Sequence, residues 1–133
     1  MSNAAGLKVL IVDDERPARQ KLRRLLGSDT EVVAIYEAAD GVAAIETIRN
    51  EAPDVVFLDV QMPGVDGFGV VDALPPDALP HLVFVTAFDT YAVRAFDMHA
   101  VDYLLKPYDA ERFGRAWARA KENVAGRLVG EER

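Results

Sequence analysis

The sequence lacks cysteine altogether, which excludes disulfide bonds and thiolate metal sites. It has no apolar run that approaches the length of a membrane span, and no recognisable signal peptide. Basic residues are also scarce, with 15 Lys and Arg against 22 Asp and Glu and a net charge of −7. Because binding to nucleic acid needs clustered basic side chains, the chain by itself is a poor nucleic-acid binder. These absences favour a cytoplasmic protein that does not contact a membrane.

What is present suits one folded domain. Hydrophobic residues make up 50% of the 133 residues, which is enough for a single core at this length. We expect residues 1–6 to be a tag or a disordered N-terminus, because Ser2, Asn3 and Ala4 are typical of a cloning remnant. Residues 7–125 are then the domain, and residues 126–133 are a polar tail or the start of a linker.

Five apolar, β-branched runs alternate with amphipathic segments. These runs are Leu7–Val12, 31–36, 55–58, His81–Thr86 and 101–105. Such alternation predicts an α/β domain in which a parallel sheet carries helices on both faces. The length and the rule of right-handed crossovers favour a five-stranded, doubly wound, three-layer α/β/α architecture.

The predicted helices carry apolar stripes. In the helix that begins at about Gly41, three positions are expected to face the core: Val42, Ile45 and Ile48. The helix that follows Asp89 or Thr90 has an apolar set of its own: Ala92, Val93 and Phe96. Stripes of this kind pack helices onto a sheet.

Polar residues stand where the predicted strands end. Asp13 and Asp14 follow the first strand, Asp59 the third, Thr86 the fourth and Lys106 the fifth. In open α/β sheets this edge binds ligands. Three crowded carboxylates repel one another, which raises the pKa of at least one unless a cation is present. Mg²⁺ fits this need better than Zn²⁺, because no Cys or His converges there.

The same residues suit phosphoryl chemistry. The Thr86 hydroxyl and the Lys106 ammonium are suitable partners for phosphoryl oxygens. Asp59 is then a plausible nucleophile that forms an acyl phosphate. Each residue alone is weak evidence, because a strand-end Asp is usually a turn or cap residue and an isolated Lys is usually on the surface. Their combination in one chain is much stronger.

Four motifs together resemble the receiver domain of two-component response regulators. They are Asp13-Asp14, residues 58–67, Thr86-Ala87 and residues 103–107. The resemblance covers about residues 8–125. It implies a flavodoxin-like fold with strand order 2-1-3-4-5 and a non-enzymatic signalling role, in which a sensor histidine kinase phosphorylates Asp59.

The resemblance also implies a metal site and a switch. Mg²⁺ would be bound by Asp14, Asp59 and the backbone carbonyl of Gln61, with Asp13 acting through water. The phosphoryl oxygens would be held by three groups, namely the Thr86 hydroxyl, the Ala87 N–H and Lys106, whose peptide bond to Pro107 would be cis. Thr86 and Tyr103 would form the switch.

The surface of the fourth helix, fifth strand and fifth helix would then change, and we expect a phosphorylation-dependent homodimer there. Five charged residues are candidates for pairs between the two copies, although such charges commonly just solvate helices. They are Asp97, Asp102, Arg112, Arg115 and Arg119.

Residues 86–96, followed by 101–107, resemble the subgroup whose regulators carry a C-terminal LytTR DNA-binding domain, and residues 13–19 support this. No such effector lies within these 133 residues. Transcription regulation and DNA binding are therefore expected only of a longer parent protein.

Two other functions fit the same pattern less well. An aspartyl Mg²⁺-dependent phosphatase needs a second Asp two residues after the first, but Gln61 stands there and cannot serve as a general acid. The chain also has no obvious cap segment. A phosphorylation-independent interaction module, or pseudo-receiver, is the remaining alternative, and the complete set of strand-end residues argues against it.

Overall fold

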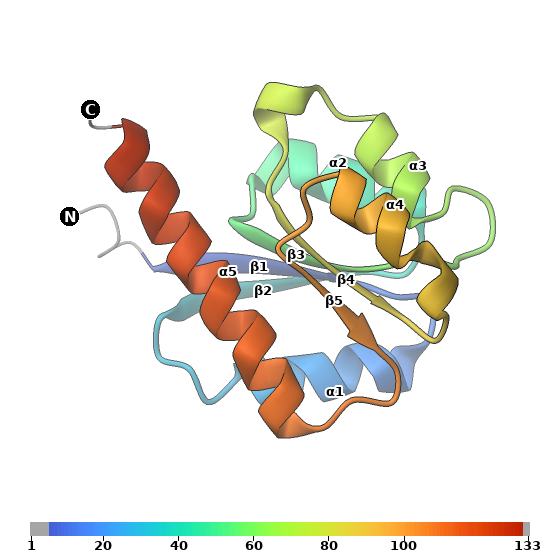
Figure 1. The fold of residues 1–133 in the computed structure, drawn as a ribbon, viewed down its shortest axis with the longest axis horizontal. Coiled ribbons are helices and arrows are strands. Elements are labelled where there is room, and N and C mark those ends of the chain that lie inside the picture. Colours follow the sequence, from blue (N-terminus) through green and yellow to red (C-terminus); the bar gives the residue numbers. More distant parts are fainter. Residues whose placement is uncertain (1–5, 132–133) are drawn as a thin grey trace.

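The computed structural model describes residues 6–131, and a parallel sheet flanked by helices forms its centre (Figure 1). The strands are β1 (Leu7–Val12), β2 (Val32–Ala38), β3 (Val55–Asp59), β4 (His81–Thr86) and β5 (Asp102–Leu105). They pair in the order β2-β1-β3-β4-β5, and every pair is parallel. The predicted fold class and strand order are confirmed. Of the predicted tag, residues 1–5 lie outside the described residues.

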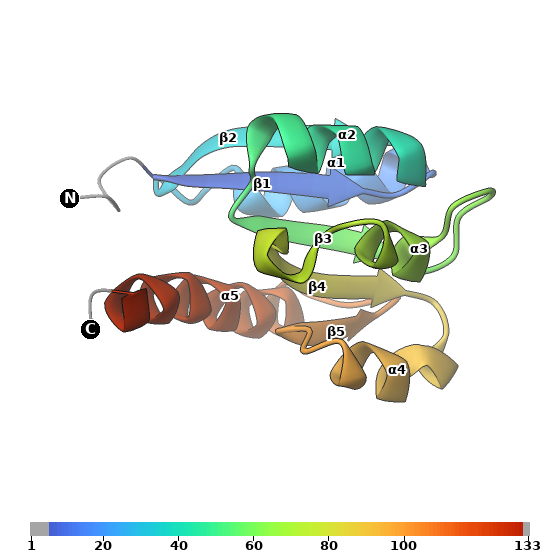
Figure 2. The same cartoon turned by 90° about the horizontal axis from the view of Figure 1, so that it is seen from above.

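The helices cover both faces of the sheet (Figures 1 and 2). They are α1 (Arg16–Leu26), α2 (Gly41–Glu51), α3 (Gly67–Asp72), α4 (Ala92–Asp97) and α5 (Ala110–Glu131), with the short 3₁₀ helices η2 (Pro76–Ala78) and η3 (Asp89–Tyr91). Helices α1 and α5 pack on one face, and α2, α3 and α4 pack on the other. None of the described helices is both long and apolar enough to span a bilayer.

Strand β3 shows why the sequence folds as a parallel sheet. All five of its residues are buried, because successive side chains enter opposite layers. Phe57 stacks against Phe113 of α5, with ring centroids 5.7 Å apart. On the other face, Phe84 of β4 packs against Phe68 of α3 at 5.2 Å. The helix layer with α5 and the helix layer with α3 thus each make their own aromatic contact with the sheet.

The predicted core position of Val42 is wrong, since this side chain is 57% exposed. The buried residues of α2 are Gly41, Ala44 and Ile48. A Cβ on Gly41 would lie 2.4 Å from the carbonyl oxygen of Val65. The bare glycine therefore lets the helix approach the β3–α3 loop closely, and this contact turns Val42 outward.

Helix α4 is shorter than the sequence suggests, because residues 89–91 form η3 before it begins. Ala95 is its buried residue. Val93 and Phe96 are 74% and 70% exposed. The apolar stripe of this helix is thus a surface feature.

Helix α5 continues to Glu131, so the backbone of the predicted polar tail is helical as far as that residue. Asp29, in the α1–β2 loop, fastens this helix to the body of the domain. Its Oδ2 accepts hydrogen bonds from the Trp117 indole at 2.7 Å and from Lys121 Nζ at 2.8 Å. The Lys121 ammonium is the main reason why the pKa of Asp29 is lowered to about 2. Trp117 packs in the core beneath this contact.

Candidate functional site

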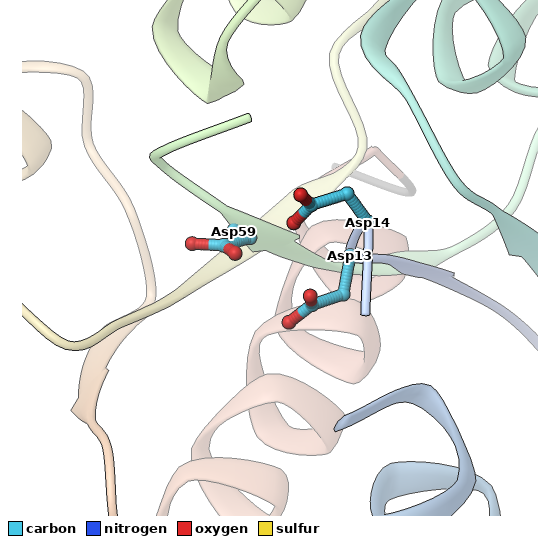
Figure 3. Close-up of side chains that lie close together, drawn as sticks. All are labelled: Asp13, Asp14 and Asp59. Atoms are coloured by element: carbon cyan, nitrogen blue, oxygen red, sulfur yellow. The ribbon is translucent and has the colours of Figure 1, made fainter. Parts of the chain in front are cut away.

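Three carboxylates meet at the carboxyl edge of the sheet (Figure 3). Asp13 and Asp14 follow β1 directly, and Asp59 ends β3. Because β1 and β3 are paired in parallel, with Val12 opposite Leu58, their ends place these side chains together. One oxygen from each carboxylate lies within 4.8 Å of the others. Asp13 and Asp59 are buried, whereas Asp14 is exposed.

Lys106 supplies the positive charge of the site. Its Nζ lies 2.8 Å from Asp13 Oδ2 and 3.5 Å from Asp59 Oδ2. Its backbone N–H donates to the carbonyl of Thr86 at 2.8 Å, which fixes the end of β5 beside the end of β4. Burial alone would lower the pKa of the lysine, but the contact with Asp13 and the charge of Asp59 raise it overall. Lys106 is therefore an ammonium at neutral pH. The peptide bond that follows it, to Pro107, is cis.

The surroundings of Asp59 shift the pKa of its carboxyl group away from the usual value. Burial raises its pKa to about 6, and the negative charge of Asp13 adds to this, while Lys106 partly offsets it. The cluster thus holds three carboxylates and one ammonium, which contacts Asp13 and Asp59. A second cation would remove the remaining repulsion. The donors are all oxygens, and the described cluster contains no His or Cys, so its chemistry fits Mg²⁺.

Thr86 and Gln61 flank Asp59. Thr86 ends β4, one residue beyond Val85, which pairs with Asp59 across the sheet. It is completely buried, and its hydroxyl accepts a hydrogen bond from the Phe88 N–H at 3.3 Å. The backbone N–H of Gln61 donates to Asp59 Oδ1 at 3.2 Å. Ala87 follows Thr86 directly in the chain. The predicted residues therefore occupy neighbouring strand ends, while their individual roles stay predictions.

The β4–α4 loop forms the rim beside these residues. The hydroxyl of Tyr103, on β5, donates to the carbonyl oxygen of Phe88. The side-chain amide of Gln61 donates to the Tyr91 hydroxyl at 2.8 Å. The Tyr91 ring in turn packs edge-on against Phe68, with centroids 5.8 Å apart. Tyr91 is not among the site residues predicted from the sequence. Its position between a strand that ends at the site and the next helix is a signal that could identify it.

The charged residues near Tyr103 pair within the chain. Arg112 binds both oxygens of Asp102, at 3.0 and 2.8 Å, and also the carbonyl of Tyr103 at 3.1 Å. Arg119 adds a further contact to Asp102 at 3.2 Å. Burial opposes ionisation of Asp102, but Arg112 and the Tyr103 N–H outweigh it, so the pKa of Asp102 is lowered. Three of the five candidates for pairs between copies thus have partners within the chain.

Comparison with known proteins is consistent with this geometry. The family described as response regulator receiver domain matches residues 9–117. An uncharacterised response regulatory protein of Yersinia pestis is 46% identical over 118 residues, which are 89% of this chain and 50% of that protein. The transcriptional regulatory protein BtsR of Escherichia coli is 45% identical over 116 residues, covering 87% of this chain and 48% of that protein. The chain therefore spans about half the length of the curated relatives it matches.

Solved structures give the same result. The response regulatory domain of mrkE from Klebsiella pneumoniae has a TM-score of 0.79 at 30% identity, covering 90% of this chain and 99% of that one. The REC domain of AraT, a response regulator from Geobacillus stearothermophilus, has a TM-score of 0.77 at 34% identity, covering 96% and 98%.

Proposed function

Because this chain belongs to the response regulator receiver domain family, we propose that it is a phosphoacceptor switch in which Asp59 takes a phosphoryl group from a sensor histidine kinase. The observation that carries the proposal is the cluster of Asp13, Asp14 and Asp59, two of which contact the Lys106 ammonium. A structural ion pair would need one carboxylate for one lysine. Three carboxylates leave negative charge that a divalent cation would offset, and the cation together with Lys106 would let the site accept an anionic phosphoryl group.

The geometry suggests how the transfer proceeds. With a pKa of about 6, Asp59 is mostly ionised at neutral pH and is able to attack phosphorus. The P–N bond of the phosphohistidine breaks as the new P–O bond forms, and the imidazole leaves with the electron pair. Lys106, already between Asp13 and Asp59, would neutralise the phosphoryl oxygens. Thr86 would donate a hydrogen bond from its hydroxyl to the phosphoryl group, while the same oxygen accepts from the Phe88 N–H.

The remaining groups complete the site. The Ala87 N–H is the proposed backbone donor to the phosphoryl group. Asp14, Asp59 and the Gln61 carbonyl would hold Mg²⁺, with Asp13 acting through water. Bound Mg²⁺ supplies positive charge that offsets both the carboxylates and the phosphoryl oxygens. The chain turns over only its own modification, so it is not an enzyme in the usual sense.

Phosphorylation by a small donor tests the proposal. The purified chain is incubated with acetyl phosphate and Mg²⁺, and its intact mass is recorded. We expect a gain of one phosphoryl group, which is lost without Mg²⁺ and in Asp59→Asn. The matched control is Asp54→Asn, because Asp54 stands just before the other end of β3 and binds the Lys8 N–H. No gain under conditions that label a known receiver would favour the pseudo-receiver alternative.

We further propose that Thr86 and Tyr103 form the switch and that phosphorylation produces a homodimer through α4, β5 and α5. Three apolar side chains on α4 and β5, Val93, Phe96 and Leu105, are exposed and support an interface there. Light scattering after acetyl phosphate treatment should give the mass of a dimer for the parent and of a monomer for Tyr103→Ala. Equal dimerisation of the phosphorylated variant would contradict the role of Tyr103.

The longer parent protein is the last part of the proposal. Residues 7–125 would be its receiver domain, and residues 126–133 would begin the connection to a LytTR-type DNA-binding domain. Support comes from curated relatives about twice as long as this chain, one of which is named as a transcriptional regulatory protein. DNA binding would then belong to the effector alone, consistent with the net charge of −7 here.

A further inference from the structure

Two side-chain hydrogen bonds join the β4–α4 loop to neighbouring elements, one to β5 and one to the β3–α3 loop. The Tyr103 hydroxyl binds the Phe88 carbonyl from β5. The Gln61 side chain binds the Tyr91 hydroxyl from the β3–α3 loop. The first bond belongs to the proposed switch, whereas the proposed function gives the second no role, although the Tyr91 backbone also interacts with Tyr103. The loop is therefore connected to the carboxylate site by a contact whose purpose the proposed function leaves open.

Gln61 connects the site to this second bond directly. Its backbone N–H donates to Asp59 Oδ1 at 3.2 Å, and its side-chain amide reaches Tyr91 at 2.8 Å. A change in the backbone at Gln61 therefore acts on the carboxylate at one end and on the tyrosine at the other. The Tyr91 ring also contacts Phe88, with centroids 6.3 Å apart, which joins both ends of the loop.

Helix α4 is the element that such a contact would control. It begins directly after Tyr91, and no side chain caps its first turn. Ala95 is its buried residue, and the Arg94 guanidinium lies over the Phe68 ring at 4.2 Å. The helix lies at the edge of the molecule beside β5 (Figure 2). With so little buried surface, its position depends on how its N-terminus is attached.

We propose that Tyr91 is a positioning residue that couples occupancy of the carboxylate site to the placement of α4 through Gln61, in addition to the switch formed by Thr86 and Tyr103. This rests on the proposed function, in which the Gln61 carbonyl binds Mg²⁺. A cation held by that carbonyl would constrain the Gln61 backbone, and the amide–hydroxyl bond would transmit this constraint to the start of α4. One such bond, present in only one arrangement, shifts a two-state equilibrium by about fivefold.

Magnesium titration followed by NMR of the backbone amides tests this coupling. In the parent, amides beside Asp59 and amides of α4 should both shift with Mg²⁺. In Tyr91→Phe, which keeps the ring but loses the hydroxyl, the shifts beside Asp59 should persist while those of α4 are lost, and the Mg²⁺ midpoint should change by no more than the coupling of about fivefold. The matched control is Tyr36→Phe, whose hydroxyl binds Glu51 on α2 at 3.2 Å, and it should behave as the parent.

A second variant approaches the bond from its other end. Gln61→Leu should also remove the α4 response, and combining it with Tyr91→Phe should cause no further loss, because both act on one contact. A full α4 response in Tyr91→Phe would overturn the inference and leave the proposed function intact. No Mg²⁺ response beside Asp59 in the parent would instead overturn the proposed function, and the inference with it.

Discussion

Asp59→Asn should be more stable than the parent at neutral pH in metal-free buffer. Burial raises the pKa of Asp59 from 3.8 to about 6, which means that the fold disfavours the charged form. A shift of this size is worth about 2 to 3 kcal/mol in the free energy of unfolding. Asparagine has nearly the same shape without the charge. We therefore expect the melting temperature to rise by roughly 6 °C, measured by circular dichroism.

The gain should depend on pH in a defined direction. The folded-state pKa of Asp59 lies above its ordinary value, so the folded parent binds more protons than the unfolded chain between about pH 4 and 6. The stability of the parent thus falls as the pH rises through this window. The advantage of Asp59→Asn should be complete above about pH 6 and should vanish below about pH 4.

Magnesium and a matched substitution provide the controls. Mg²⁺ should stabilise the parent more than Asp59→Asn, because binding to the folded state adds to its stability and the variant lacks one ligand. Asp54→Asn makes the same chemical change just before the other end of β3 and should give no gain. If Asp59→Asn proved less stable than the parent in metal-free buffer at pH 7, burial of the Asp59 charge would not be the dominant effect.

Arg112→Met should cost about 2 kcal/mol in the free energy of unfolding, less than the roughly 3 to 5 kcal/mol for a fully buried pair. The variant leaves Asp102, whose side chain is 8% exposed, without the two hydrogen bonds from the Arg112 guanidinium. The smaller figure is appropriate because Arg119 still contacts Asp102 and because Arg112 is itself partly exposed. Urea unfolding at pH 7 would measure the loss.

Two further variants isolate the unpaired charge. Arg115→Met, at an exposed position of the same helix, should be nearly neutral. Adding Asp102→Asn to Arg112→Met should recover part of the loss. Because the pKa of Asp102 is lowered in the fold, the stabilisation by Arg112 is complete above about pH 4, and the cost of Arg112→Met should shrink as the pH falls below this value. A loss no larger than that of Arg115→Met would mean that the pair is only a surface contact.

The strands were the most predictable part of this molecule. Leu7–Val12 and His81–Thr86 have the bounds that their apolar runs predict, because most of their residues are buried on one face of the sheet or the other. Lys8 is the charged residue inside the first of these strands, and it lies near the start, where burial is only partial. The strand ends then bring Asp13, Asp59 and Lys106 together, since parallel pairing fixes which residues share an edge. Strand β2 is less regular, because it lies at the sheet edge with Val33 exposed, and it runs two residues further than predicted.

Helices and side-chain contacts were harder to predict. Helical periodicity does not tell which face of a helix is buried, so the sequence predicts Val42 as a core residue. In the structure the close approach of Gly41 to the β3–α3 loop turns Val42 outward. The bond from Gln61 to Tyr91 joins residues thirty positions apart. Charge patterns alone likewise did not reveal that Asp102 is paired within its own chain.

The placement of Trp117 has a consequence for optical measurements. It is the only tryptophan in the sequence, and it packs on the face of the sheet that carries α1 and α5, away from α4. We expect its fluorescence to change on unfolding and on protonation of Asp29, which its indole binds. We expect no change when the β4–α4 loop or α4 moves. The lack of native cysteine offers the remedy. Val93→Cys would create a unique thiol at an exposed position of α4, to which an environment-sensitive dye can be attached.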